Sequence, residues 1–233
     1  MSRRTVISFA SHDFYKSQQR LAGEFAASGL FNRIISYKQT DLNGTEFLAH
    51  HRQFIVRNRR GFGYWIWKPY LIGRTLAAMN DGEWLYYSDS GCTLETGPDA
   101  VAYMEKFATG LEAAQQPIHA ITESEHPIGK LCKADVLDPL YADCREVETG
   151  RLIIRKCPES VAFIEKWAAA AIADNYHNID DTPSRQAERP EFIEHRHDQS
   201  IFSILWYRAG YSILPESEYI ARSIWRATRL RDD

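Results

Sequence analysis

The clearest hydrophobic pattern is an apolar, aromatic run at residues 84–87 (WLYY), which stops abruptly at the polar run 88–91 (SDSG). A turn at residues 80–82 (NDG) precedes it, and this order predicts a buried β-strand that ends in a polar loop. Asp89 would then lie at the carboxyl end of a central strand, where ligands of open α/β sheets collect. There it can meet a phosphate-bound metal or a sugar hydroxyl. The alternative is an ordinary turn, since Asp, Ser and Gly all favour turns.

Strand-like and helix-like patterns alternate along the rest of the chain. β-Branched and apolar runs predict further strands at residues 5–10, 33–37, 117–122, 151–155 and 211–214. Apolar residues at helical spacing predict helices at about residues 17–28, 45–58, 68–79, 98–108, 129–140, 158–172 and 194–209. A chain of 233 residues that opens strand, helix, strand predicts one Rossmann-like α/β domain, with a mostly parallel central sheet flanked by helices.

Charge and cysteine usage exclude several classes of protein. The net charge is -3, so the chain lacks the overall basic field that attracts nucleic acid, and no nucleic-acid partner is expected. The apolar run near the N-terminus is too short for a signal peptide or a membrane span, which predicts a cytoplasmic protein. The cysteines are widely spaced, which indicates neither a zinc knuckle nor a disulfide framework.

Residues 59–71 (RRGFGYWIWKPYL) have an unusual composition. Two glycines loosen the backbone, large aromatic residues follow, and Lys68 with Pro69 opens a predicted helix. A cation beside a helix N-terminus suits a phosphate. The alternative is that Trp65 and Trp67 are core aromatics and that Lys68 is a solvated residue at the start of the helix.

A second polar cluster, His197-Asp198-Gln199, lies in the first turn of the predicted helix at 194–209. It follows a long polar loop at residues 175–190, of a length that is usually functional or mobile. Histidine, carboxylate and amide together give a titratable group, an acceptor and a donor on one rigid element. Alternatively Asp198 only caps the helix, because an acidic residue is favoured in a first turn.

Taken together, these motifs resemble the nucleotide-sugar glycosyltransferases of the GT-A fold, particularly the retaining glycogenin-like and mannosyltransferase-like groups. The shared features are a cation on a helix, a hydrophobic strand ending in a D-x-D type loop, and a late H-D-Q helix, spread over residues 9–214. The segments W-x-W-K-P and Y-x-D-x-G-C resemble a bacterial subgroup associated with surface polysaccharide assembly.

The resemblance implies roles for individual residues. Lys68 stands where such enzymes place a cation near the nucleotide diphosphate, and Asp89 stands at the first aspartate of D-x-D, which helps to hold the donor and its divalent metal. Asp198 and Gln199 match a pair near the sugar carbon under attack, with His197 beside them. The donor-binding residues that the resemblance implies are Ala10, Ser11, Trp65, Lys68, Asp89, Ser90 and Gly91, with the nucleoside base at the strand end Phe9-Ala10-Ser11.

The third position of the D-x-D motif departs from the pattern. It is Gly91, so a Mn²⁺ or Mg²⁺ cofactor would lose one of its two expected carboxylates. Mn²⁺ and Mg²⁺ prefer oxygen ligands and can take some of them from substrate phosphates and water. Asp89 with His195 or His197 could then be enough protein ligands to hold the ion. Equally, Lys68 and its helix N-terminus could replace the metal altogether.

The C-terminal residues 219–231 (YIARSIWRATRLR) interleave arginines with apolar residues. They predict a basic amphipathic tail at 217–233, separate from a catalytic domain at 1–216, that lies on an anionic membrane where a lipid-linked acceptor would be found. An ordinary surface helix is the alternative.

The implied activity is transfer of a sugar, as by a hexosyltransferase, from a nucleotide-sugar donor to a saccharide or lipid-linked acceptor in surface polysaccharide synthesis, with retention. The loop at 175–190 would cover the donor and exclude water. A metal-dependent hydrolase with His195, His197, Asp198 and Asp89 as ligands is a second possibility. A third is a carbohydrate-binding module in which the aromatics of residues 64–67 stack on sugar rings.

Overall fold

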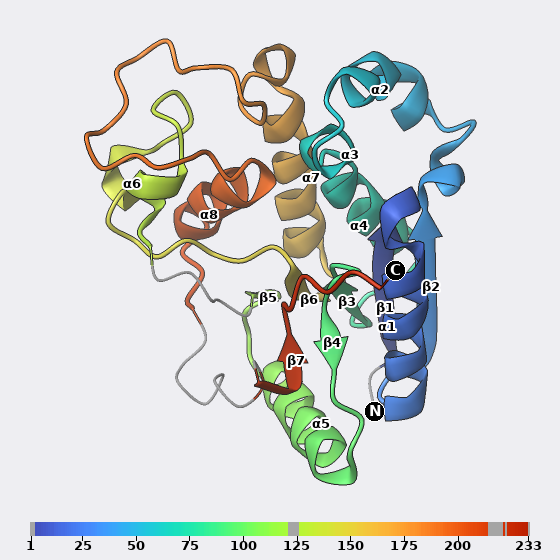
Figure 1. The fold of residues 1–233 in the computed structure, drawn as a ribbon. Helices are drawn as coiled ribbons and strands as arrows, with labels where there is room; N and C mark the ends of the chain where they lie inside the picture. Colours follow the sequence, from blue (N-terminus) through green and yellow to red (C-terminus); the bar gives the residue numbers. More distant parts are fainter. Residues whose placement is uncertain (1–2, 121–125, 214–220, 222, 233) are drawn as a thin grey trace.

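The structure, a computed structural model, describes residues 3–120, 126–213, 221 and 223–232 of the chain. A five-stranded sheet in the order β2-β1-β3-β6-β5 forms its centre (Figure 1). The strands are β1 (Arg4–Ala10), β2 (Arg33–Lys38), β3 (Trp84–Ser88), β5 (Ile118–Ala120) and β6 (Arg151–Arg155). β1 runs parallel to β2 and β3, and only β6 opposes its neighbours. The predicted α/β fold with a mostly parallel central sheet is therefore confirmed.

Helices cover both faces of this sheet. They are α1 (Tyr15–Ser28), α2 (Glu46–Arg57), α3 (Gly61–Tyr64), α4 (Trp67–Ala77), α5 (Pro98–Glu112), α6 (Ile128–Leu131), α7 (Pro158–Ile172) and α8 (Asp198–Arg208). Short 3-10 turns lie at His12–Phe14, Gln39–Leu42, Pro139–Tyr141 and Asp174–Tyr176. A second, two-stranded sheet joins β4 (Thr93–Leu94) to β7 (Trp225–Arg226).

The alternation of side chains along the strands builds two hydrophobic layers. In β3, Leu85 and Tyr87 face the layer that contains α4, α7 and α8, whereas Trp84 and Tyr86 face α1, α5 and β7. All four side chains are buried, because successive residues of a strand point to opposite faces and both faces are covered. The polar residues that follow β3 therefore emerge at the edge of a rigid, fully packed strand.

Several predicted elements are shorter than expected or absent. The helix predicted at 129–140 is limited to α6, because Lys130 and Leu131 offer their carbonyls to the backbone of residues 193–196 instead of continuing the helix. The helix predicted at 194–209 begins only at Asp198. Residues 211–213 of the strand predicted at 211–214 form no strand, and residue 214 lies outside the described residues. The strand predicted at 117–122 spans Ile118–Ala120, and residues 121–122 lie outside the described residues.

The basic helix predicted at 219–231 is found only in small part: among the described residues, 221, 223 and 224 are helical, and residues 225–232 are not. Trp225 and Arg226 form β7, which pairs with β4, and Ile224 and Trp225 are buried in the core. The apolar face required for membrane contact is therefore turned inward at these residues. The predicted boundary between residues 216 and 217 lies outside the described residues. Within the described chain, no helix combines the length and the apolar character needed to cross a membrane.

Candidate active site

A cleft of about 840 Å³ opens where β1 and β3 end. Its floor includes residues that directly follow these strands, Ser11 after β1 and Asp89 after β3. The carboxyl ends of the two parallel strands meet at this edge, so their loops face one space. Nine of the ten predicted site residues lie on its wall: Ser11, Trp65, Lys68, Asp89, Ser90, Gly91, His197, Asp198 and Gln199.

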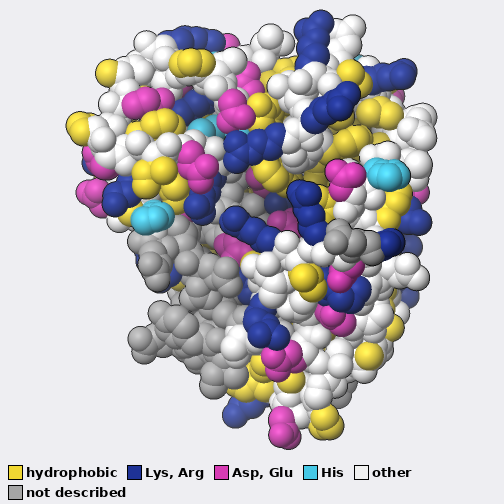
Figure 2. Space-filling view, viewed as in Figure 1, with side chains coloured by type: hydrophobic (Ala, Val, Ile, Leu, Met, Phe, Trp, Pro, Cys, Tyr) yellow, Lys and Arg dark blue, Asp and Glu magenta, His cyan; other side chains and the backbone are white. Residues whose placement is uncertain are grey.

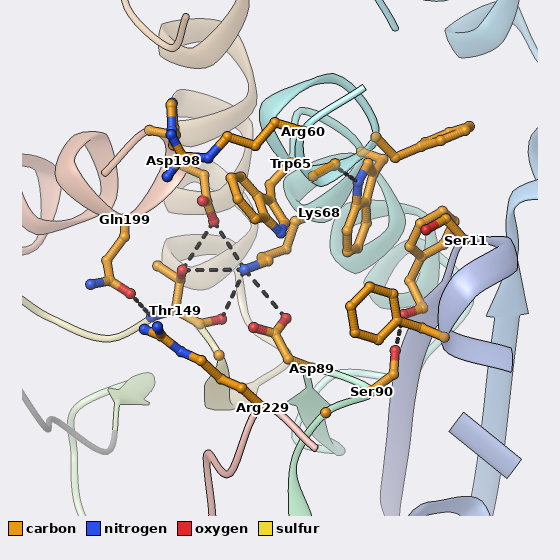
Figure 3. A pocket seen from close by; sticks show the side chains of 18 of the residues that line it. Ser11, Arg60, Trp65, Lys68, Asp89, Ser90, Thr149, Asp198, Gln199 and Arg229 are labelled. Carbon is orange, nitrogen blue, oxygen red and sulfur yellow. Dashed lines mark hydrogen bonds and ion pairs between the residues drawn. The ribbon is translucent and has the colours of Figure 1, made fainter. Parts of the chain in front are cut away.

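Lys68 joins the two predicted carboxylates in the centre of the cleft (Figure 3). Its Nζ lies 3.0 Å from Oδ2 of Asp198 and 3.4 Å from Oδ1 of Asp89. Its side chain is only 2% exposed, and Asp198 is almost as enclosed at 6%, whereas 42% of the Asp89 side chain is exposed. Lys68 comes from the first turn of α4, Asp89 follows β3, and Asp198 begins α8. Three elements distant in sequence thus converge on one buried cation.

The protonation of this cluster follows from burial and charge. Burial alone disfavours the ammonium form, but the charges of Asp198 and Asp89 outweigh it and raise the pKa of Lys68 above its ordinary value. Lys68 therefore stays positively charged. Burial raises the pKa of Asp198, and the neighbouring Lys68 opposes that shift. A charged lysine between the two carboxylates is the arrangement that costs least in this enclosed space.

Neighbouring polar groups hold both carboxylates in place. Tyr87 donates to Oδ1 of Asp89 at 2.5 Å, and Thr149 donates through its hydroxyl to Oδ2 of Asp198 at 3.0 Å. Thr149 also accepts from Lys68 Nζ at 3.2 Å. These bonds use one oxygen of each carboxylate, and the described residues make no hydrogen bond to Oδ2 of Asp89 or Oδ1 of Asp198. Those two oxygens remain available to a ligand in the cleft.

Gln199 connects the cleft to a buried acid behind it. Its Oε1 accepts from the backbone N–H of Thr149 at 3.4 Å, and its Nε2 donates to Oε2 of Glu146 at 2.6 Å. Glu146 is fully buried, and burial raises its pKa to about 8, although Gln199 and Arg196 partly oppose the shift. Both ends of the Gln199 amide are therefore engaged, which fixes the Thr149 loop against α8.

His197 is held in a strained backbone conformation with φ 54° and ψ -120°. Its ring stacks on Tyr64 at 4.6 Å, and Nδ1 donates to the carbonyl oxygen of Ile179 at 2.8 Å. Nε2 has no hydrogen-bond partner among the described residues and lies 3.6 Å from Asp181. This strain explains why the helix predicted at 194–209 starts late, since residue 197 cannot be helical in this conformation.

His195 does not face the cleft as a metal ligand would. Its Nε2 must donate to the carbonyl oxygen of Asn178 at 2.9 Å, and its Nδ1 accepts from the backbone N–H of Lys133 at 3.3 Å. Burial lowers its pKa to about 3, so the ring is neutral. Both nitrogens are used, and no lone pair is left for a metal.

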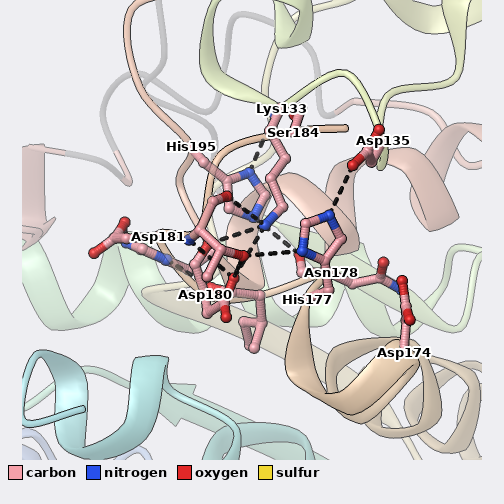
Figure 4. Close-up of polar contacts among 12 residues, drawn as sticks. Lys133, Asp135, Asp174, His177, Asn178, Asp180, Asp181, Ser184 and His195 are labelled. Atoms are coloured by element: carbon pink, nitrogen blue, oxygen red, sulfur yellow. Dashed lines mark hydrogen bonds and ion pairs between the residues drawn. The ribbon is translucent and has the colours of Figure 1, made fainter. Parts of the chain in front are cut away.

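The loop predicted to cover the donor, residues 175–190, is held mainly by Lys133 and Asp135, which do not line the cleft (Figure 4). The buried Lys133 Nζ lies 3.2 Å from Oδ1 of Asp180 and 3.3 Å from the carbonyl oxygen of Thr182. His177 contacts Asp135 at 2.7 Å. None of the residues that line the cleft belongs to this loop. In this arrangement the loop contributes no residue to the cleft wall, and its Asp181 contacts the wall residues Arg60 and His197 at 3.7 and 3.6 Å.

One wall of the cleft is aromatic, and a left-handed turn presents it. All five residues of 61–65 have positive φ values, from 51° at Tyr64 to 84° at Gly63. The ring of Trp65 lies against Gly61, where an added Cβ would come within 2.4 Å of the indole. Phe62, Trp65 and Trp67 line the cleft, and the Trp67 ring packs 3.9 Å from that of Phe9. The two glycines permit this turn, so the glycine pattern in the sequence has a structural reason.

Two predicted donor-binding residues have other structural roles. Of the strand end Phe9-Ala10-Ser11 predicted to hold the base, Phe9 and Ser11 line the cleft, but Ala10 is buried and does not, so the prediction is wrong for Ala10. Successive side chains of a strand point to opposite faces, which turns Ala10 away from the cleft. Ser90 lines the cleft, but its hydroxyl donates to the carbonyl oxygen of Phe9, which ties the β3 loop to β1.

The predicted metal ligand Asp89 is supplied with a cation by the chain itself, since Lys68 lies 3.4 Å away. Among the described residues, no group of three or more His, Cys, Asp or Glu side chains is placed to hold a metal ion. One carboxylate already paired with a lysine does not make a Mn²⁺ or Mg²⁺ site, since these ions take several oxygen ligands.

The sequence motifs missed most of the basic side chains around the cleft. Figure 2 shows Lys and Arg side chains gathered around a central hollow, with acidic side chains between them. The arginines on the cleft wall are Arg59, Arg60, Arg196, Arg229 and Arg231. The sequence analysis placed Arg229 and Arg231 on a membrane-facing helix, because the arginines there alternate with apolar residues. Thr149 was also missed, since it lies in a loop without a recognisable motif.

Comparisons with known proteins give likenesses in structure only, as no family model and no curated protein sequence matches the chain. A glycosyltransferase involved in glycosylation of the major capsid of PBCV-1 aligns over 83% of this chain and 81% of its own, at 12% identity and a TM-score of 0.41. The glycosyltransferase GlyE of Streptococcus pneumoniae aligns over 94% of this chain at 15% identity and a TM-score of 0.45, and this chain spans 46% of it. Mouse xyloside xylosyltransferase 1 aligns over 92% of this chain and 85% of its own, at 13% identity and a TM-score of 0.45. Likenesses at this level assign neither a family nor an activity to this chain.

Proposed function

We propose that this chain is a glycosyltransferase of the GT-A type, which moves a sugar from a nucleotide-sugar donor to a hydroxyl group of a saccharide or lipid-linked acceptor, with retention. We place the reaction in the cytoplasm and in the synthesis of surface polysaccharide. The observation that carries the proposal is the meeting of Asp89 and Asp198 on Lys68, inside one cleft at the ends of β1 and β3. The resemblance of the motifs that contain these residues supports it.

In the proposed reaction, the bond between the anomeric carbon and a phosphate oxygen breaks, and its electron pair leaves with the nucleoside diphosphate. The acceptor oxygen forms the new bond to the anomeric carbon, and its proton passes to the departing phosphate. The chain must stabilise negative charge on the diphosphate and positive charge on the sugar. Lys68 serves the first need from the buried side of the cleft.

The two carboxylates serve the sugar. Oδ1 of Asp198 and Oδ2 of Asp89, which make no hydrogen bond to the described residues, would accept from sugar hydroxyls and favour the developing oxocarbenium charge. Gln199 and His197 act as positioning residues: Gln199 fixes the Thr149 loop that bonds Asp198, and His197 sets the start of α8. The nucleoside base would lie between Ser11 and the aromatic wall.

A thermal-shift screen tests the proposal directly. Sugar nucleotides should raise the melting temperature with the logarithm of their concentration, and free sugars should not. With a donor found in this way, Asp89→Asn and Asp198→Asn should each lower the rate of transfer by about a hundredfold or more. Asp143→Asn, which changes a 97% exposed carboxylate outside the cleft wall, is the matched control and should leave the rate unchanged. Normal turnover in either cleft variant would remove that carboxylate from the mechanism.

The same screen separates the competing functions. A rise with free sugars and none with sugar nucleotides would indicate a carbohydrate-binding module, which the aromatic wall at Phe62 and Trp65 would suit. The predicted metal-dependent hydrolase lacks support from the geometry, because both ring nitrogens of His195 are occupied by the backbone.

A further inference from the structure

We propose that guanidinium groups of the C-terminal segment, chiefly that of Arg229, bind the diphosphate of the donor in place of a metal ion held by a D-x-D motif. The proposal deepens the proposed function and rests on it, since it names the chemical partner of the leaving group. It starts from the one position at which the sequence departs from that motif, Gly91.

Gly91 is a site of close backbone contact. A Cβ added there would lie 3.0 Å from Cα and 3.2 Å from the carbonyl carbon of Arg229, and 3.4 Å from the nitrogen of Leu230. The carbonyl oxygen of Gly91 accepts from the Leu230 N–H at 3.0 Å and from the Thr228 hydroxyl at 2.7 Å. These partners are largely backbone atoms, which cannot give way as a flexible side chain can. An aspartate at position 91 would therefore crowd the C-terminal segment, which would have to shift by a few tenths of an ångström to accept it.

The docked segment brings cations into the cleft that holds Asp89. Arg229 and Arg231 both line the cleft that holds Asp89, and Figure 3 shows the Arg229 side chain extending toward Thr149. Arg229 has a left-handed backbone with φ 53°, a conformation that a non-glycine residue holds only when its surroundings fix it. The guanidinium of Arg231 lies 4.6 Å over the ring of Phe14, which holds it beside the cleft.

Arg229 is also free to take an anion. The other central cations are engaged, because Lys68 is bound by two carboxylates and Arg196 contacts Glu146 and Glu194. No carboxylate in the described part of the chain forms an ion pair with Arg229, and its side chain is exposed to the cleft. A planar guanidinium can donate two parallel hydrogen bonds to phosphate oxygens, so it supplies both charge and orientation.

Calorimetric titration of the purified chain with UDP, GDP, ADP and CDP, first in EDTA and then with added Mn²⁺, tests the proposal. At least one nucleoside diphosphate should bind in EDTA, with an affinity that Mn²⁺ changes by less than about twofold. Arg229→Gln should weaken that binding by about tenfold to a hundredfold, the loss expected for hydrogen bonds to a charged group. Binding of the corresponding nucleoside, which lacks phosphate, should not change.

Two further variants make the test specific. Arg226→Gln removes an arginine of the same segment whose side chain is 51% exposed and paired with Glu95, outside the cleft, so the affinity should stay at the wild-type value. Gly91→Ala leaves Arg229 intact but adds a Cβ 3.0 Å from its Cα, so the segment must shift by a few tenths of an ångström, and diphosphate binding should weaken by less than in Arg229→Gln.

The possible failures are distinguishable. Binding of a nucleoside diphosphate only when Mn²⁺ is present, or equal binding by wild type and Arg229→Gln, would overturn this inference and leave the proposed transferase standing. Binding of no nucleoside diphosphate under either condition would overturn the proposed function itself.

Discussion

Burial distinguishes two aspartates that the sequence presents as equivalent. Asp198 is 6% exposed in its side chain and is the shorter contact of Lys68, at 3.0 Å, whereas Asp89 is 42% exposed and lies 3.4 Å away. Removal of one partner from a buried ion pair costs about 3–5 kcal/mol, whereas an exposed pair contributes about 0–1 kcal/mol. The two residues should therefore differ in their importance for stability, even if transfer requires both.

Asp198→Ala is accordingly expected to lower the melting temperature by about 10 °C, because it leaves the buried ammonium of Lys68 with one half-exposed partner. Asp89→Ala should lower it by less than about 4 °C. Asp198→Asn, which can still accept from Thr149, should fall between the two. Thermal unfolding followed by circular dichroism measures all three variants. Equal melting temperatures for Asp89→Ala and Asp198→Ala would show that Lys68 is less enclosed than its contacts indicate.

Glu146 should make stability depend on pH. Burial raises its pKa to about 8 from 4.5, so the folded chain holds this proton more tightly than the unfolded chain. The resulting stabilisation is fully present below pH 4.5 and is lost as the pH rises through about 8. The side chain of the Glu146→Gln variant cannot ionise. The difference in melting temperature, variant minus wild type, should therefore be more positive at pH 8 than at pH 5. Melting curves at both values test this, with the exposed Glu165→Gln as control; an equal difference between wild type and Glu146→Gln at both values would contradict it.

At the scale of elements, the sequence predicts well wherever an element is long and packs on a sheet face. The strand before Asp89 and the helix α7 are found at or within a residue of their predicted bounds. In both, the spacing of apolar residues in the sequence matches the side chains that are buried in the structure. The predictions fail where distant backbone takes over the hydrogen bonds. α6 ends at Leu131 because residues 193–196 bond to its last carbonyls, and β7 forms because β4 is within reach. A pattern read over a few neighbouring residues cannot predict hydrogen-bond partners that lie so far away in the sequence.

For residues 61–65 the sequence predicted a loosened backbone but not the left-handed turn that the structure shows. The sequence could not show how closely Gly63 approaches α2. A Cβ added at Gly63 would come within 2.8 Å of Cγ1 of Ile55. Gly63 also has φ 84°, which a residue with a side chain rarely adopts. The turn is therefore fixed by its contact with α2 as well as by its own residues.

Gly63→Ala should consequently destabilise the chain by about 1–3 kcal/mol and weaken donor binding, because the turn that carries Trp65 must shift. The matched control is Gly23→Ala in α1, where no atom lies within 4 Å of the added Cβ and a gain of about 0.5–1 kcal/mol is expected. Chemical denaturation gives the free energies of unfolding. A Gly63→Ala variant as stable as wild type would mean that the turn can move away from Ile55 without cost.

At the scale of the whole molecule, the C-terminal residues complete the domain that the N-terminal strands begin. Trp225 is 1% exposed and packs in the same layer as Tyr86, and its indole N–H donates to the Ser88 hydroxyl at 3.1 Å. Further on, Asp232 pairs with Arg20 of α1 at 2.8 Å. Figure 1 shows the end of the chain returning beside α1 and β1. The residues that close the core thus also bring Arg229 to the cleft.

The variant Trp225→Ala tests whether the C-terminal segment is part of the folded core or a detached tail, as the sequence predicted for residues 217–233. If Trp225 closes the core, its truncation should cost about 3–5 kcal/mol, as for other buried tryptophans, and lower the melting temperature by about 10 °C. Leu140→Ala, which truncates a 76% exposed apolar side chain, should leave the melting temperature nearly unchanged. A detached tail would make the two variants alike. Because β7 positions the residues that follow it, Trp225→Ala should also weaken nucleoside diphosphate binding at temperatures at which the variant is still folded.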